Sequence, residues 1–226
     1  MRAAVAPGVT TAALDAIGEA ALAAHGARSA PRLVYGFPGC NCISVNDEIV
    51  HGIPGKRVIA PGDMVKLDVT AECHGYYADA ADTVLVPPVS DTARRLRTSA
   101  VESFHAALKQ ASIGTLVNEV GRAVERRAHD DGFAIVRELC GHGIGRTIHE
   151  PPEVPNYYAA GQRDRLTEGL VLTIEPMLTA RRTRTVQQPD GWTISTDDGC
   201  LSAHYEHTLI VTAHGPELVT LSAPAQ

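Results

Sequence analysis

The chain has 226 residues, of which 44% are hydrophobic and 20% are charged, and its formal net charge is −6. A chain of this length buries about 70% of the surface that its unfolded form exposes, so one domain needs no disulfides. The mild acidity argues against nucleic acid as the main partner, because phosphate-binding proteins cluster Lys and Arg. The five cysteines lack the spacing of a disulfide framework, which favours a reducing compartment, the cytoplasm. We expect no signal peptide and no membrane span.

The first predicted element is a helix over residues 11–25, where Ala and Leu recur on one face between a Pro-Gly pair and a Gly. Residues 37–53 have strand character, with a short alternating run over 41–45 after a Gly/Pro-rich turn. A β-hairpin follows, with one arm over 64–70 and the other over 75–79. Each arm of this hairpin carries one Asp.

Two amphipathic helices are predicted in the middle of the chain, over 91–110 and 117–130, because apolar residues recur there at helical spacing. A loop rich in Gly and His is expected over 141–149, followed by a Pro-rich turn over 151–155. The predicted helices and strands do not alternate regularly.

Strands are predicted over 170–174, 192–195 and 206–212 in the last third of the chain. Strands grouped together, with helices that do not alternate with them, indicate the α+β class. We therefore expect residues 1–226 to form a single domain, with an antiparallel sheet packed under helices on one face.

The side chains that best explain a function are four carboxylates and one imidazole spread along the chain. They are Asp68, Asp79, His142, Glu175 and Glu206. Hard oxygen ligands with a single nitrogen suit Mn, Fe, Co or Zn in a paired site, and they differ from the thiolate sets of structural zinc. The set predicts a two-metal hydrolase.

Asp68 and Asp79 lie on the two arms of the predicted hairpin. A loop of several residues would bring them opposite one another, where cross-strand neighbours stand about 5 Å apart. Two carboxylates held this close repel one another unless a cation lies between them. Taken alone, each Asp also fits a turn or the edge of a sheet, so the pairing carries the argument.

The other three residues occupy different settings. Glu175 ends a strongly β-forming run, and Glu206 begins one, so each buried carboxylate needs a partner. His142 lies among three glycines, which allow tight backbone turns around the imidazole. Read alone, His142 fits an ordinary loop histidine equally well.

Five short stretches together carry a family resemblance. They are His51-Gly52-Ile53-Pro54, Leu67-Asp68-Val69-Thr70, Gly141-His142-Gly143-Ile144-Gly145-Arg146 with His149-Glu150, Thr173-Ile174-Glu175-Pro176-Met177, and Tyr205-Glu206-His207-Thr208. The chain resembles the methionine aminopeptidases in these stretches, and the resemblance extends from about residue 5 to residue 220. It implies the pita-bread α+β fold of creatinase and the aminopeptidases, and removal of the initiator methionine from nascent proteins.

The resemblance also assigns roles to the five metal-binding residues. It implies a cofactor of two divalent metal ions, Co, Mn, Fe or Zn. Asp79 and Glu206 would bridge the two ions, Asp68 would bind one of them, and His142 and Glu175 would bind the other.

Further residues receive roles by resemblance. Glu175 would act as general base, His149 would contact the substrate amide, and His51 would line the opening and help to stabilise the tetrahedral intermediate. The methionine side chain would bind a pocket that includes Phe37, Cys42 and Trp192. Two positions depart from the family, because Phe37 stands where a Tyr is common and Ile148 where a Phe is common.

The thirty residues between Glu175 and Glu206 leave no room for the helical insertion of the second type of the family, so the chain resembles the first, bacterial type. The family's usual N-terminal helix has no counterpart ahead of residue 5, and we expect reduced stability or a substitute contact there. The expected partners are nascent peptides, with the ribosome as a candidate, and the chain is expected to be a monomer. The alternative is a pita-bread binding protein without peptidase activity.

Overall fold

The strands of the main sheet are antiparallel, as the sequence predicts. The structure is a computed structural model that describes residues 1–221. Within these residues every strand pairing is antiparallel, and nine strands form one sheet in the order β1-β4-β5-β14-β9-β7-β8, with β2 beside β4 and β15 beside β14. Two three-stranded sheets, β13-β10-β6 and β11-β12-β3, complete the α+β architecture.

Most strands are short, and two long ones form the central hairpin. The strands of the main sheet are β1 (Arg28–Ser29), β2 (Cys42–Val45), β4 (Met64–Cys73), β5 (Tyr76–Leu85), β7 (Cys140–Gly143), β8 (Glu150–Pro155), β9 (Val171–Ile174), β14 (Glu206–Thr212) and β15 (Gly215–Leu218). The strands of the smaller sheets are β3 (Glu48–Val50), β6 (Ala134–Ile135), β10 (Met177–Thr179), β11 (Thr185–Gln187), β12 (Ile194–Thr196) and β13 (Ser202–His204).

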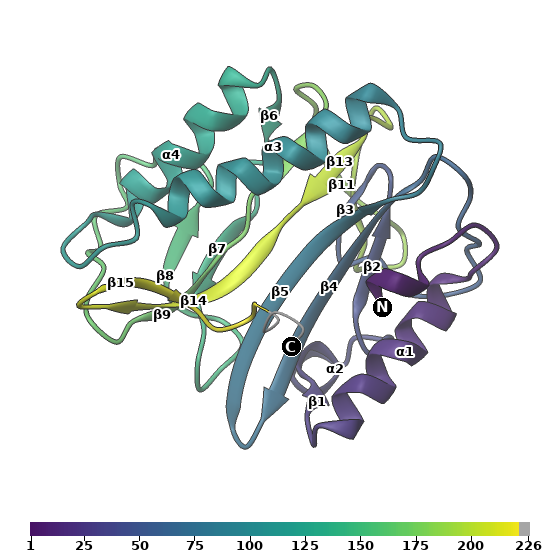
Figure 1. Ribbon diagram of the computed structural model, residues 1–226, viewed down its shortest axis with the longest axis horizontal. Coiled ribbons are helices and arrows are strands. Elements are labelled where there is room, and N and C mark those ends of the chain that lie inside the picture. Colours follow the sequence, from purple (N-terminus) through teal and green to yellow (C-terminus); the bar gives the residue numbers. More distant parts are fainter. Residues whose placement is uncertain (222–226) are drawn as a thin grey trace.

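The helices cover the sheet in two groups, as Figure 1 shows. They are α1 (Thr11–Ala24), α2 (Ala30–Tyr35), α3 (Asp91–Leu108) and α4 (Val117–Asp130), preceded by a 3-10 helix at Arg2–Ala4. Helices α3 and α4 lie side by side and pack on β9 and β14, whereas α1 packs on β2 and β4. The sequence predicted α1, α3 and α4 to within two residues at each end.

Hydrophobic spacing and N-caps explain where these helices form. Helix α3 buries Leu96, Ala100 and Phe104 on one face, which is the stripe that the sequence predicts. The Ser90 hydroxyl accepts a hydrogen bond of 3.1 Å from the backbone N–H of Ala93 and so caps the helix. Thr10 caps α1 in the same way. The short helix α2 was not predicted from the sequence.

The expected loop over 141–149 and the expected turn over 151–155 are partly wrong, because strands β7 and β8 occupy these regions. The glycines of β7 have negative φ, so they are not needed for tight turns. They allow close approach instead. A Cβ on Gly141 would lie 2.6 Å from the carbonyl oxygen of Thr173, and one on Gly143 would lie 2.3 Å from that of Pro151. The prolines fit because β8 is an edge strand, where a missing N–H is tolerated.

The β4–β5 hairpin places its two aspartates diagonally and not directly opposite one another. Asp68 pairs with Ala81, and Asp79 pairs with Thr70. Because side chains alternate along a strand, Asp68 and Thr70 lie on the same face, and so does Asp79. The two carboxylates are therefore diagonal neighbours on one face of the sheet.

Candidate metal centre

The five predicted metal-binding residues come from five neighbouring strands of the main sheet. Asp68 lies on β4, Asp79 on β5, Glu206 on β14 and His142 on β7, and Glu175 directly follows β9. These strands are consecutive in the sheet order β4-β5-β14-β9-β7. All five side chains line one cavity of about 360 Å³. Positions up to 138 residues apart in the chain thus meet at one place.

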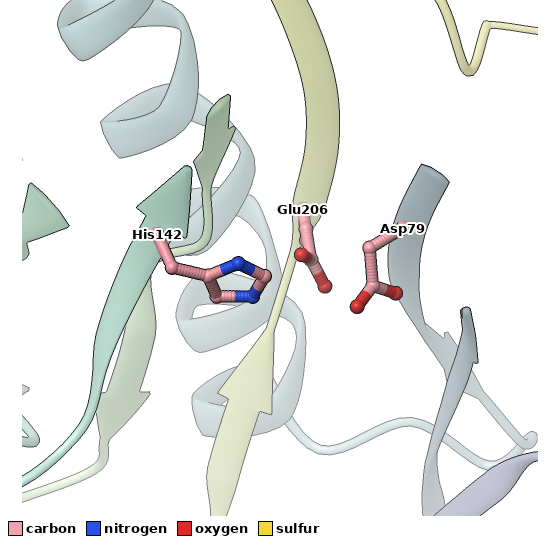
Figure 2. A group of neighbouring side chains, drawn as sticks. All are labelled: Asp79, His142 and Glu206. Carbon is pink, nitrogen blue, oxygen red and sulfur yellow. The ribbon is translucent and has the colours of Figure 1, made fainter. Parts of the chain in front are cut away.

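The side chains of Asp79, His142 and Glu206 point toward one another, as Figure 2 shows. One ligand atom from each of the three lies within 4.8 Å of the other two. His142 Nε2 also lies 3.6 Å from Glu175 Oε1. The 3.6 Å separation is one that two ligand atoms of a single cation can have, because each ligand atom lies about 2.0–2.2 Å from its metal.

Threonine hydroxyls hold two of the carboxylates in place. Thr70 Oγ1 donates to Asp79 Oδ2 over 2.7 Å, and Thr173 Oγ1 donates to Glu175 Oε1 over 2.8 Å. Thr173 Oγ1 also accepts from the backbone N–H of His142 over 3.0 Å, so one hydroxyl positions two of the predicted ligands. Such outer contacts orient metal ligands.

The carboxylates repel one another and are buried, so they need a cation. Burial, and then the negative charge of neighbouring carboxylates, raise the pKa values of Asp68, Glu175 and Glu206 well above their usual range. Burial also raises the pKa of Asp79. Asp79 Oδ1 and Glu206 Oε1 are buried without a hydrogen-bond partner. Buried and partly unpaired carboxyl oxygens fit divalent metal ions, which would stabilise their charged form and satisfy them.

His142 is prepared to bind a metal through Nε2. Its Nδ1 donates to the carbonyl oxygen of Gly143 over 2.9 Å, which fixes the tautomer and leaves the Nε2 lone pair directed at the carboxylates. Burial lowers the pKa of His142, so the ring is neutral near pH 7. A neutral imidazole is the form that coordinates metal.

His51 and His149 lie at the opening of the same cavity. The ring of His149 is 4.2 Å from that of His142 between centroids, and the Tyr35 hydroxyl is hydrogen-bonded to His149 Nδ1 over 2.5 Å. His51 adopts a left-handed backbone with φ of 57°. The next residue, Gly52, lies so close to β2 that a Cβ there would be 2.4 Å from the carbonyl oxygen of Ile43. A backbone conformation this unfavourable for a non-glycine residue persists only where the surrounding structure holds it, so the position of His51 is fixed by its neighbours.

The three predicted pocket residues line the same cavity as the five predicted ligands, and Cys42 pairs with Asp68 across strands β2 and β4. The rings of Phe37 and Trp192 meet edge to face with 5.2 Å between centroids. Cys42 is buried, and burial with the nearby carboxylates raises its pKa well above the usual value, so it stays a thiol. Ile148 and Met177 extend the apolar wall. This lining suits a flexible apolar side chain.

Sequence reasoning missed His204 and Tyr35, which also line the cavity. His204 is 2% exposed, and burial lowers its pKa to about 3, so the ring is neutral. Its position two residues before Glu206 was the available signal, because residues two apart along an extended chain share a face. No comparable signal marks Tyr35, which belongs to the unpredicted helix α2.

Fold and site together define a metallopeptidase, and the chain belongs to metallopeptidase family M24, which residues 1–213 match. It is 41% identical to a methionine aminopeptidase of Clostridium perfringens over 96% of this chain and 87% of that protein. It is 39% identical to methionine aminopeptidase 2 of Bacillus subtilis over 95% of this chain and 87% of that protein. The family predicted from the sequence is confirmed.

Solved structures agree with these relatives. The chain matches a methionine aminopeptidase of Thermotoga maritima with a TM-score of 0.95 and 34% identity, covering 98% of this chain and 89% of that one. It matches the methionine aminopeptidase of Rickettsia prowazekii with a TM-score of 0.92 and 36% identity, covering 96% of this chain and 88% of that one. A prolidase of Pyrococcus furiosus, at 21% identity and a TM-score of 0.77, shows the shared fold alone. The pita-bread fold is therefore confirmed.

One narrower expectation also agrees with the structure. Between Glu175 and Glu206 the chain forms strands β10 to β13 and turns, without the helical insertion of the second type of the family. Across residues 1–221, no helix combines the length and apolar character that crossing a bilayer requires.

Proposed function

We propose that this protein removes the initiator methionine from nascent chains, as a metal-dependent aminopeptidase of the bacterial type. The observation that carries the proposal is the convergence of Asp68, Asp79, His142, Glu175 and Glu206 beside an apolar pocket. The cofactor is a pair of divalent metal ions. Co, Mn, Fe and Zn all suit this ligand set, and metal availability decides among them.

The arrangement of the five side chains would let them hold two ions. Asp79 and Glu206, on adjacent strands, lie between Asp68 on one side and Glu175 with His142 on the other. All five would serve as ligands of the pair. A pair of divalent cations supplies activation of water and polarisation of the scissile carbonyl.

The remaining chemistry belongs to residues of this chain. Glu175, fixed by Thr173, takes a proton from the attacking water and passes it to the leaving amine. His149, held at the cavity opening by Tyr35, contacts the substrate amide through Nε2. His51, on the same opening, helps to stabilise the tetrahedral intermediate. The pocket of Phe37, Cys42 and Trp192 receives the methionine side chain.

The metal pair explains selection of a chain end. A free α-amine has a nitrogen lone pair that would bind the ion held by Asp68, whereas the nitrogen of an internal peptide bond would not. The protein works in the cytoplasm as a monomer, where it meets methionine at the N-termini of new chains, and the ribosome is a candidate partner. The described residues, 1–221, make up one catalytic domain.

A panel of three peptides tests this function. Met-Ala-Ser is expected to release methionine, because both its side chain and its free α-amine fit the cavity. Leu-Ala-Ser should turn over more slowly, because its branched side chain fits a pocket shaped for a thioether less well. N-acetyl-Met-Ala-Ser should not be cleaved. Release of methionine from the acetylated peptide at the rate of the free one would contradict the proposal.

The alternative, a binding protein without peptidase activity, is not favoured. Such a protein has no need to hold four carboxylates close together, since unpaired buried charges are costly. Binding of Met-Ala-Ser without turnover, at any metal loading, would restore that alternative.

A further inference from the structure

We propose that His204 is a sixth ligand of the metal centre, which binds through Nε2 an ion that Glu175 and Glu206 also hold. The inference rests on the proposed two-metal function and extends its ligand set. It would give the centre four carboxylates and two imidazoles.

The first argument is the unsatisfied imidazole. His204 is 2% exposed, and neither ring nitrogen has a hydrogen-bond partner. A buried polar group without a partner costs free energy. The ring lines the same cavity as the predicted ligands. A cation in that cavity would supply the missing partner of one nitrogen.

The second argument is distance. His204 Nε2 lies 3.5 Å from Glu206 Oε2 and 3.9 Å from Glu175 Oε2. Two ligand atoms that each lie about 2.1 Å from one ion stand about 3.0 Å apart at a right angle and about 3.4 Å apart in a tetrahedron. If the ligand–metal–ligand angle is wider, the two ligand atoms can stand up to about 4.2 Å apart. Both observed separations fall within this range.

The third argument is that the backbone holds the ring in this place. Thr83 Oγ1 accepts from the backbone N–H of His204 over 3.0 Å and donates to its carbonyl oxygen over 2.8 Å. Thr83 lies on β5, and His204 ends β13, which pairs with β10. Contacts to two other strands therefore fix the position from which the side chain enters the cavity.

Lys66, a buried neighbour, does not supply the missing hydrogen bond. Its Nζ donates to the carbonyl oxygens of Asn46 and Ser202 and to the Ser202 hydroxyl, over 2.7–3.0 Å. An ammonium group has three N–H donors, so its donors are all used. The imidazole of His204 is left for a ligand.

A second imidazole changes what the centre prefers. Nitrogen ligands suit Co and Zn well, whereas a mainly carboxylate set suits Mn. We expect His204→Gln to weaken the binding of one Co²⁺ ion at least about tenfold to hundredfold, because loss of an outer-shell contact alone has an effect of this size. The affinity for Mn²⁺ should fall less. Isothermal titration calorimetry measures both affinities.

Proton NMR of the Co²⁺-loaded protein in H₂O counts the coordinated imidazoles directly. Each imidazole bound through one nitrogen shows one strongly shifted, exchangeable N–H signal from the other. His142 Nδ1–H is bonded to Gly143, and His204 Nδ1 is buried, so both protons should be visible. We expect two such signals in the native protein and one in His204→Gln. The matched control is His207→Gln, because His207 is bonded to Thr220 and Tyr205 outside the cavity; it should keep both signals.

The outcomes separate this inference from the function on which it rests. One shifted signal in the native protein, kept in His204→Gln, would overturn the sixth ligand and leave the five-ligand centre standing. No shifted signal would overturn both. Counting signals in the native protein does not depend on whether a variant folds.

Discussion

Replacing Glu175 by Gln is expected to abolish most methionine release while leaving the fold intact. Glu175 combines two roles, as a metal ligand and as the general base, and loss of a positioned base alone costs about 10²- to 10⁴-fold in rate. The side chain keeps its size, and an amide can still accept the Thr173 hydrogen bond. Steady-state kinetics with Met-Ala-Ser, at saturating metal, measures the loss.

The metal-free form of Glu175→Gln provides a second readout. Its midpoint of thermal unfolding should equal or exceed that of the metal-free native protein, because the change removes one of several buried carboxylates that repel one another. Glu168→Gln is the matched control, since Glu168 is exposed and away from the cavity. It should leave turnover unchanged. Native-like turnover in Glu175→Gln would refute the role of Glu175.

Stability of the metal-free protein is expected to depend on pH through the carboxylate cluster. Burial and neighbouring charge raise the pKa of Glu206 well above its unfolded value of 4.5. A group whose pKa is raised by folding contributes stability below the unfolded pKa, and this contribution is lost as pH rises through the folded pKa. In the metal-free native protein this stabilising contribution therefore begins to fall above about pH 4.5, the pKa of Glu206 in the unfolded chain, and is lost once the pH passes the folded pKa.

Glu206→Gln isolates the effect, because a neutral amide has no such titration. We expect the variant, without metal, to gain in unfolding free energy relative to the native protein as pH rises from 5 to 8. With metal present, the native protein should become the more stable of the two. Chemical denaturation at several pH values, with the exposed Glu217→Gln as control, measures both differences. A variant-to-native difference that stays constant with pH would contradict this account.

The five residues predicted as ligands line one cavity, but part of their geometry could not be predicted from the sequence. Asp68 and Asp79 were correctly assigned to the two arms of one hairpin. Their diagonal register was missed because both strands run on to a two-residue turn, His74-Gly75, with φ of 51° and 80°. That turn needs positive φ at both positions, which Asn-Gly or Asp-Gly signals more clearly than His-Gly.

The prediction of a loop around His142 was wrong for a different reason. Glycine allows positive φ, and it also allows close approach of backbones, and the sequence alone does not distinguish the two. The structure shows close approach, so His142 lies on a strand between β8 and β9. His204 and Tyr35 were missed because their roles depend on strands and a short helix that meet only in the folded protein.

Metal content measured together with turnover tests the central claim most directly. Elemental analysis of the active protein should find two divalent ions per chain. Dialysis against a chelator should remove them and abolish release of methionine from Met-Ala-Ser, and added Co²⁺ or Mn²⁺ should restore it. Undiminished turnover by protein from which all metal has been removed would contradict the account.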